Sequence, residues 1–313
     1  MASDNANANI FVSTCGFNER HIRDTIENAY DMAAEPDRVS FGIFDQKSSG
    51  VPIESYKGLK RVKVIHASAD EPVGVGQARL NASLLHTDEK YLCQTDSHNY
   101  FAQDWDTKCV DMYETLLAVA DRPIIAQSAM WHRQSEVTPE YKALWSVYPN
   151  CIKPVPLKLS PRGNTELDVG RANEPKILGQ FLEHHLFYAN GFFTTSKFIY
   201  EVSHNPFVKY FCEQELSSLR AATRGYRMFS TDTPLFSTMT KTVEGGSFND
   251  EDFPDDAMVV RARAFTNSDD TLRYITGRQF GWYGAPDKQS YDKYIQESGN
   301  DFVNAHYAVS FRK

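Results

Sequence analysis

Three consecutive residues, Asp96-Ser97-His98, combine a carboxylate and an imidazole, two side chains that could bind a divalent cation beside a diphosphate. They follow a strand-like run, residues 90–94, and precede an aromatic stretch. Alternation along an extended segment would place Asp96 and His98 on the same side. A carboxylate oxygen and an imidazole nitrogen could then share one Mn²⁺ or Mg²⁺, with the mixed pair favouring Mn²⁺. The competing interpretation is an Asp that only caps the following turn.

A second acidic residue has a similar place in the pattern. Asp45-Gln46 follows the β-rich run VSFGIF, residues 39–44. This pair could contact the ribose or the base of a nucleotide at the end of a strand. An Asx turn that simply ends the strand is the alternative.

Two further segments could contribute charge. The glycine-rich residues 74–79 are expected to open a helix whose N–H groups meet a phosphate, with Arg79 adding a charge-assisted contact. Glu213 and Glu215 flank Gln214 just before a helix predicted for residues 216–224. Residues two apart lie on opposite faces of a strand or about 200° apart around a helix. Only one of these glutamates should therefore face a substrate, and the other should be solvated at the helix start.

These residues need a scaffold that brings strand ends together, and the first 130 residues provide that pattern. The predicted strands are residues 10–13, 39–44, 61–67, 90–94 and 123–126, and the predicted helices are 19–32, 76–85 and 103–120. The first strand is expected to end in a turn at residues 14–16. Alternating strands and helices indicate an α/β fold with a Rossmann-like, mainly parallel sheet flanked by helices. Ligands bind beyond the carboxyl ends of such strands, where Asp45 and Asp96 would lie.

The pattern loosens in the second half of the chain. Residues 131–174 are rich in proline and aromatic side chains, which predicts a packed excursion over the site. Gly225 suits the position after the helix at 216–224. The acidic and glycine-rich residues 242–256 predict a surface loop.

Composition bounds the class of protein. The 313 residues are 41% hydrophobic and include 20 Phe, 16 Tyr and 4 Trp, which argues against disorder. A net charge of −8 gives no general attraction to nucleic acid or anionic lipid. The five cysteines form no C-x-x-C pair, so reduced thiols are expected rather than disulfides or zinc. With no signal peptide and no long apolar run, we expect a cytoplasmic protein without a membrane partner (in the host cytoplasm if the chain is viral).

Seven segments together are more specific than any one of them. They are IFVSTCGFNE (10–19), VSFGIFDQ (39–46), GVGQARLNAS (74–83), YLCQTDSHNYFAQDWD (91–106), NGFFTTSKFI (190–199), EQELSSLRAATRGYRMFS (213–230) and SYDKYIQESGNDF (290–302). With them the chain resembles the cytosolic-type polypeptide α-N-acetylglucosaminyltransferases, which are retaining, nucleotide-sugar-dependent enzymes with the A-type glycosyltransferase fold. The most specific part is QTDSHNYF followed by WD, because this family has Asp-Ser-His where many relatives have Asp-x-Asp.

The resemblance implies a role for each candidate residue. Asp96 and His98 would hold the metal and the diphosphate, with Ser97 beside the donor. Asp45 and Gln46 would contact the nucleoside, Arg79 would lie near the nucleotide sugar, and Glu213 or Glu215 would lie under the transferring sugar or the acceptor hydroxyl. It also implies a catalytic domain over residues 1–240 and a small C-terminal subdomain over 241–313.

Two departures from the family pattern stand out. The family's further metal-binding His, in a short apolar strand, has no counterpart in residues 234–240. His184, His185 and His204 are the alternatives, or a water could replace it. The family's adjacent acidic pair is split here by Gln214, which leaves the choice between the two glutamates open.

The leading interpretation is a retaining glycosyltransferase that moves a GlcNAc-like sugar from a UDP-sugar to a protein hydroxyl. The aromatic-rich residues 131–148 could close over the donor and exclude water. Retention can proceed by same-face attack or through a covalent intermediate on one of the two glutamates, and the sequence does not choose between them.

Two other functions remain open at this stage. A virus-type DNA glycosyltransferase acting on hydroxymethylated bases could grip phosphates with the basic residues 57–63 and with Arg220, Arg224 and Arg227. A non-catalytic nucleotide-sugar-binding relative would fit the missing His. The combination of Asp96, His98 and Arg79 argues against that third interpretation.

Overall fold

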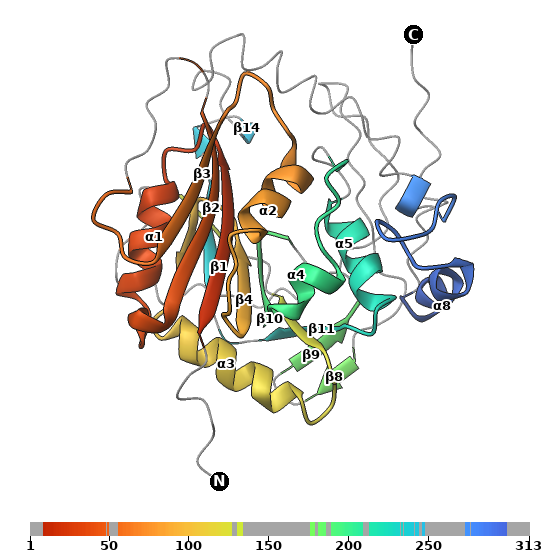
Figure 1. The fold of residues 1–313 in the computed structure, drawn as a ribbon. Helices are drawn as coiled ribbons and strands as arrows, with labels where there is room; N and C mark the ends of the chain where they lie inside the picture. The colour runs from red at the N-terminus through yellow and green to blue at the C-terminus, as the bar shows by residue number, and fades with distance from the viewer. Residues whose placement is uncertain are drawn as a thin grey trace.

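A broad mixed sheet forms the centre of the protein (Figure 1). The computed structural model describes residues 9–47, 49, 56–126, 130–133, 176–178, 181–185, 189–208, 213–231, 233, 235–240, 242–243, 246–247, 273–275 and 277–298. In this part of the chain, nine strands form one sheet in the order β3-β2-β1-β4-β10-β6-β11-β9-β8. Their bounds are β1 (Ile10–Phe17), β2 (Val39–Lys47), β3 (Val62–Ser68), β4 (Tyr91–Thr95), β6 (Pro123–Ala126), β8 (Lys176–Leu178), β9 (Phe181–His184), β10 (Gly191–Thr195) and β11 (Arg227–Thr231).

Strand direction confirms the predicted mainly parallel sheet. The first four strands pair in parallel, and so do β6 and β11. Antiparallel β10 lies between β4 and β6, so those two strands share a direction. Strand β9 is antiparallel to both β11 and β8, so β11 and β8 also share a direction. Of the nine, β10 and β9 therefore run opposite to the rest, as expected for the A-type glycosyltransferase arrangement predicted above.

Helices cover both faces of this sheet because side chains alternate along its strands. Ile10 and Val12 point into a core with α1 (Ile22–Asp31) and α3 (Trp105–Leu116). Phe11 points to the other face, which holds α4 (Lys197–Glu201) and α5 (Glu213–Ala222). On that face α2 (Val75–Ser83) packs Ala78 and Ala82 against Phe44. The outcome is a three-layer α/β structure.

The C-terminal helix α8 (Lys288–Ser298) lies beside α5 in Figure 1. Leu216 and Leu219 of α5 share a buried cluster with Tyr291 and Tyr294 of α8. The described C-terminal residues thus pack directly on the helix that begins with the two candidate glutamates.

Two central strands extend further than predicted. The expected turn at residues 14–16 is wrong, because Thr14, Cys15 and Gly16 continue the parallel pairing of β1 with β2. The Asx-turn alternative for Asp45 is also wrong, because β2 continues through it and pairs with β3 up to Lys47. Two neighbouring parallel strands supply the backbone hydrogen bonds that a local turn would otherwise provide.

A small sheet supports the segment that follows Asp96-Ser97-His98. Strand β5 (Asn99–Phe101) pairs with β12 (Phe236–Thr240), which pairs with β7 (Met130–Arg133). The remaining short elements are the 3₁₀ turn η2 (Pro36–Arg38) and the pair β13 (Thr242–Val243) and β14 (Gly246–Ser247).

The WD dipeptide of the most specific segment has a structural role. The buried Trp105 donates from Nε1 to the Ala29 carbonyl at 2.8 Å. Asp106 accepts hydrogen bonds of 2.8 Å from the backbone N–H groups of Ala34 and Glu35. Both residues join α3 to the end of α1, so this part of the motif positions helices rather than a ligand.

Some predictions fall outside the described residues. The excursion expected over residues 131–174 is described only for the backbone of β7, and most of the loop expected at 242–256 is not described. Among the helices that are described, none is both long and apolar enough to cross a membrane.

Candidate active site

The carboxyl ends of β1, β2 and β4 meet at one edge of the sheet. Parallel register places Gly16 opposite Asp45, and Asp45 opposite His66. The chain leaves β4 at Thr95 and enters the Asp96-Ser97-His98 segment at the same edge. The strand-end argument for gathering Asp45 and Asp96 at one edge is therefore correct.

Arg79 joins two carboxylates from distant parts of the chain. It lies in α2 and is 4% exposed. Its Nη2 donates to Asp96 Oδ1 at 2.8 Å, and its Nε lies 2.5 Å from Glu213 Oε1. This Arg79–Asp96–Glu213 cluster brings three of the predicted residues together.

The electrostatics of this cluster depend on burial. Burial raises the pKa of Glu213, an effect that the neighbouring Arg79 only partly offsets. Burial alone would lower the pKa of Arg79, but Glu213 and Asp96 raise it, so the guanidinium stays charged. The Arg79 Nη1 atom is buried and has no hydrogen-bond partner. A cation with an unused donor at a strand-end site is suited to an anionic ligand.

The first turn of α5 settles how the split acidic pair is placed. Glu213 belongs to the Arg79 cluster, whereas Glu215 is two residues further around the helix. The expectation that one of them is solvated is wrong, since both are buried. Gln214 between them accepts a 3.3 Å hydrogen bond from the Ala189 N–H, which ties α5 to the turn before β10.

The Asp96-Ser97-His98 segment is a turn, not the extended stretch that was expected. Thr25 of α1 donates from Oγ1 to the Ser97 carbonyl at 3.0 Å, and Ser97 is buried. Asp96 and His98 consequently have different partners, Arg79 for the first and Glu19 for the second. The prediction of an extended segment was wrong because hydrogen bonds to residues distant in the sequence fix this turn.

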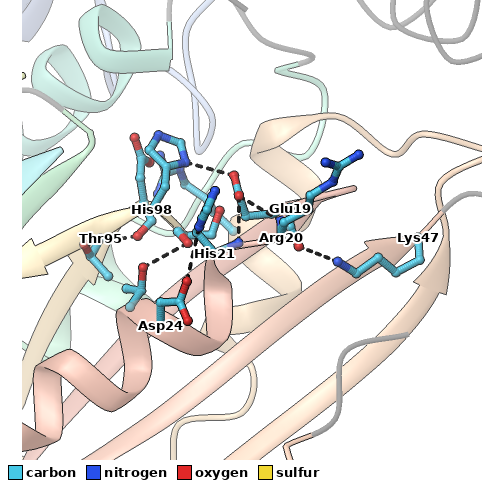
Figure 2. A network of polar contacts seen from close by, with 11 residues as sticks. Glu19, Arg20, His21, Asp24, Lys47, Thr95 and His98 are labelled. Carbon is cyan, nitrogen blue, oxygen red and sulfur yellow. Dashed lines mark hydrogen bonds and ion pairs between the residues drawn. The ribbon is translucent and has the colours of Figure 1, made fainter. Parts of the chain in front are cut away.

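Glu19 is the site residue that sequence reasoning missed. Its Oε2 lies 3.0 Å from His98 Nδ1, and its Oε1 accepts the N–H groups of Arg20 at 2.8 Å and His21 at 3.0 Å. Figure 2 shows the His98 ring and the Glu19 carboxylate facing each other, with Lys47 reaching the Glu19 backbone carbonyl. Its place at the end of the segment IFVSTCGFNE could have indicated a site residue. The helical periodicity that begins at residue 19 instead predicted a helix residue without a role in the site.

Asp45 is closed in by its neighbours and is 0% exposed. Tyr56 donates to its Oδ2 at 3.0 Å, while Lys47 and His66 are each 3.7 Å from one of its oxygens. Burial raises its pKa, although Lys47 and Tyr56 oppose that rise. Its Oδ1 has no hydrogen-bond partner, so the site holds a buried acceptor that a ligand could satisfy.

The other half of the predicted pair is already engaged. Gln46 is buried and donates from Nε2 to the Ser68 carbonyl at 2.8 Å. Its side chain therefore fixes the end of β3 beside Asp45.

The phosphate expected at the start of α2 does not fit this structure. Gly74 adopts φ 87°, which favours glycine, and the helix begins at Val75. The Gly76 N–H donates to the Val208 carbonyl at 2.9 Å, and a Cβ on Gly76 would lie 2.0 Å from the Asn205 carbonyl oxygen. Because another segment covers this helix start, only Arg79 of the glycine-rich stretch contributes to the site.

The three arginines considered for phosphate binding are also occupied. Arg220 is 1% exposed and donates to the carbonyls of Ser203 and Trp282. Arg224 donates to the Trp282 and Gly284 carbonyls, both within 3.0 Å. Arg227 pairs with Glu183 at 2.6 Å. The periodic arginines thus hold the C-terminal segment and β9 instead of forming an exposed basic surface.

Asp96 and His98 carry the two groups that the sequence predicted as metal ligands. Asp96 is 27% exposed at its side chain, and a neutral His98 ring that donates from Nδ1 carries its lone pair on Nε2. One carboxylate and one imidazole fit a cation whose shell a diphosphate completes. Within the described residues no group of three or more His, Cys, Asp and Glu could hold a metal ion.

Of the three histidines named as replacements, His185 and His204 belong to no group of three possible metal ligands among the described residues. His204 is buried, and burial together with Arg79 and Arg220 lowers its pKa well below the ordinary value. The His185 carbonyl accepts from Tyr294 at 2.8 Å. The side chain of His184 lies outside the described atoms.

Comparison with protein families decides the class. A family model described as "Glycosyltransferase (GlcNAc)" matches residues 52–303, most of the chain. The chain belongs to this family. The narrower cytosolic polypeptide α-N-acetylglucosaminyltransferase group is not distinguished by that match. None of the curated proteins matches the sequence significantly.

Solved structures of other proteins share the fold of this chain. The crystal structure of S. aureus TarS matches with a TM-score of 0.55 and 11% identity, over 97% of this chain and 44% of that chain. The TarS fragment 1–349 matches with a TM-score of 0.52 and 11% identity, over 96% of this chain and 72% of that chain. The chain thus spans less than half of full TarS, and at this identity the likeness shows the fold alone.

Proposed function

We propose that this glycosyltransferase moves a GlcNAc-like sugar from a UDP-sugar to a hydroxyl acceptor on a protein, with retention of configuration. The observation that carries the proposal is the Arg79–Asp96–Glu213 cluster at the carboxyl edge of the sheet. The description of the matching family supports GlcNAc as the sugar.

Asp45 and Gln46 would receive the nucleoside. The Oδ1 atom of Asp45 lies 3.7 Å from Lys47 Nζ but has no hydrogen-bond partner, so it can accept a hydrogen bond from a base N–H or a ribose hydroxyl. Gln46 holds the neighbouring strand end and so shapes the pocket wall. A donor that satisfies this buried acceptor recovers the free energy that its isolation costs, about 1–3 kcal/mol.

The diphosphate would be received by Arg79, Asp96 and His98. Ser97 holds the turn between Asp96 and His98. Asp96 and His98 are the residues that would hold Mn²⁺ or Mg²⁺. When bound, such a cation neutralises charge on a departing diphosphate. Arg79 supplies fixed positive charge at the same place, and its unpartnered Nη1 offers a donor.

Glu213 is the carboxylate that we assign to the transferring sugar. It shares Arg79 with Asp96, so it lies beside the residues proposed for the leaving group. Glu215 lies around the helix from it and is the alternative. Same-face attack needs Glu213 only to orient the sugar or the acceptor, whereas a covalent route needs it as the nucleophile.

The placement of the three arginines considered for DNA favours a protein acceptor. The other basic residues considered for DNA, Lys57, Lys60, Arg61 and Lys63, are exposed. Arg220 and Arg224 donate to backbone carbonyls and Arg227 pairs with Glu183, so none of the three is presented for a nucleic acid backbone. A net charge of −8 gives no compensating attraction.

The test is a mass-spectrometric assay in which UDP-GlcNAc is offered with protein and hydroxymethylated-DNA acceptors. Transfer to protein hydroxyls is expected, and labelling of DNA alone would contradict the acceptor assignment. Asp96→Ala should reduce transfer and donor turnover by about 100-fold or more. Its thermal transition should stay close to wild type, because Arg79 retains Glu213. Near-normal activity of this variant would overturn the site assignment.

A further inference from the structure

Glu19 is a carboxylate that the proposed reaction does not itself use, yet both of its oxygens are engaged by neighbouring residues. It is 4% exposed and lies just before α1. The N–H groups of Arg20 and of His21, the N-cap residue of α1, both donate to Oε1. The position of Oε1 is thereby fixed, and Oε2 is directed at His98 Nδ1, 3.0 Å away.

This contact decides where the imidazole carries its proton. An ionised carboxylate can only accept hydrogen bonds, so His98 Nδ1 must be the donor. A neutral ring has one N–H, which leaves the lone pair on Nε2. Histidines that bind metals commonly donate from their other nitrogen to a carboxylate in this way, which fixes both ring orientation and tautomer.

We infer that Glu19 is a positioning residue that holds the His98 ring with its proton on Nδ1 and presents Nε2 to a divalent cation. The cation part of this inference rests on the proposed function, whereas the tautomer part concerns the protein alone. The backbone around Glu19 is held from β2 as well, because Lys47 donates to the Glu19 carbonyl (Figure 2). The contact spans 79 positions in the sequence, so it is set by the fold and not by local geometry.

Glu19→Gln tests the inference without removing volume. The two backbone N–H groups will keep the amide oxygen, so the amide NH₂ group must face His98. Nδ1 then has to accept a hydrogen bond, and the ring proton moves to Nε2. Nitrogen-15 NMR of the His98 ring, in metal-free protein at a pH where the ring is neutral, reads this tautomer directly.

Thr25→Val is the matched control. It removes the hydrogen bond that holds the same turn through the Ser97 carbonyl, but it leaves the Glu19–His98 pair in place. A purely structural role for Glu19 would make the two variants alike. The inference predicts that only Glu19→Gln changes the tautomer.

Mn²⁺ binding, followed by electron paramagnetic resonance in the presence of UDP, gives the second readout. Glu19→Gln should weaken Mn²⁺ binding by about 10- to 100-fold, and Thr25→Val should weaken it less. A wild-type ring protonated on Nε2, or a Glu19→Gln ring still protonated on Nδ1, would overturn the inference. If wild type binds no Mn²⁺, the cation role of His98 fails, and the NMR result alone decides whether Glu19 sets the tautomer.

Discussion

The two edges of the central sheet treat a buried carboxylate in opposite ways. At the carboxyl edge, Asp45 is fully buried, keeps one oxygen without a hydrogen-bond partner and has a raised pKa. At the amino edge, Glu89 precedes β4, and both its oxygens are engaged by Ser40 and Thr87. Burial would raise the pKa of Glu89, but these hydrogen bonds bring it down to about 2.

The difference matches the roles that we propose for the two residues, Glu89 for the fold and Asp45 for a ligand. Full hydrogen bonding makes the ionised form of Glu89 stabilising. Incomplete hydrogen bonding makes the ionised form of Asp45 a cost to the fold, which a bound donor could remove. Buried polar groups left incomplete at the ligand-binding edge of an α/β sheet are typical of a functional site.

The largest effect is expected from removing the guanidinium group of Arg79, which pairs with two carboxylates at the carboxyl edge. Arg79→Met leaves Glu213 buried without its partner and Asp96 without a donor, so unfolding should become easier by about 3–5 kcal/mol. Sugar transfer should fall by about 100-fold or more. Arg79→Lys keeps the charge but lacks the fork that reaches both carboxylates, so it should recover stability better than activity. Denaturant unfolding measures the loss of stability, and a transfer assay measures the loss of activity. Wild-type stability and activity of Arg79→Met would contradict the role given to the Arg79–Asp96–Glu213 cluster.

A smaller effect, on stability alone, is expected at the amino edge. Glu89→Gln should lower the free energy of unfolding by about 1.5–3 kcal/mol, because hydrogen bonds from Ser40 and Thr87 lose their charged acceptor. The folded pKa of about 2 lies below the ordinary 4.5, so the wild-type contribution is complete above pH 4.5 and is lost as pH falls towards 2. Unfolding measured across that range should be less pH-dependent in the variant. A loss of donor binding in Glu89→Gln would contradict the claim that the amino edge contributes to stability alone.

The smallest effect is expected from Asp45→Asn. The raised folded pKa means that ionised Asp45 opposes folding at neutral pH, and this cost disappears as pH falls through the folded pKa. Replacing it with a neutral amide should leave stability unchanged or raise it by up to about 1 kcal/mol. Donor affinity should fall by about 10-fold, because a charged acceptor is lost. Thermal unfolding and donor titration separate the two effects, and a clear loss of stability would contradict the assignment of Asp45 to a ligand.

Local pattern was enough for the parts of the fold that depend on neighbouring residues. The strand and helix alternation of the first 130 residues predicted β1 to β4 with α1 to α3 between and beyond them, and thus the edge that holds Asp45 and Asp96. The strand ends were misplaced because pairing with β2 and β3 extends the strands beyond their apolar runs.

Contacts between distant residues could not be read from the sequence. Nothing in the glycine-rich stretch reveals that Val208 covers the start of α2, or that Arg79 joins Asp96 to Glu213. Periodic arginines on a helix predict an exposed row of charges. The sequence does not reveal that the C-terminal segment around Trp282 covers them. The Glu19–His98 pair is hidden for the same reason.

Donor binding to three forms of the protein tests most directly whether the donor occupies the carboxyl edge of the sheet. Titration calorimetry with UDP-GlcNAc and Mn²⁺ would compare wild type, Asp96→Ala at the carboxyl edge and Glu89→Gln at the amino edge. Asp96→Ala is expected to bind the donor about 100-fold more weakly, whereas Glu89→Gln is expected to bind it like wild type despite its lower stability. Equal binding by wild type and Asp96→Ala would contradict the claim that the donor occupies the carboxyl edge of the sheet.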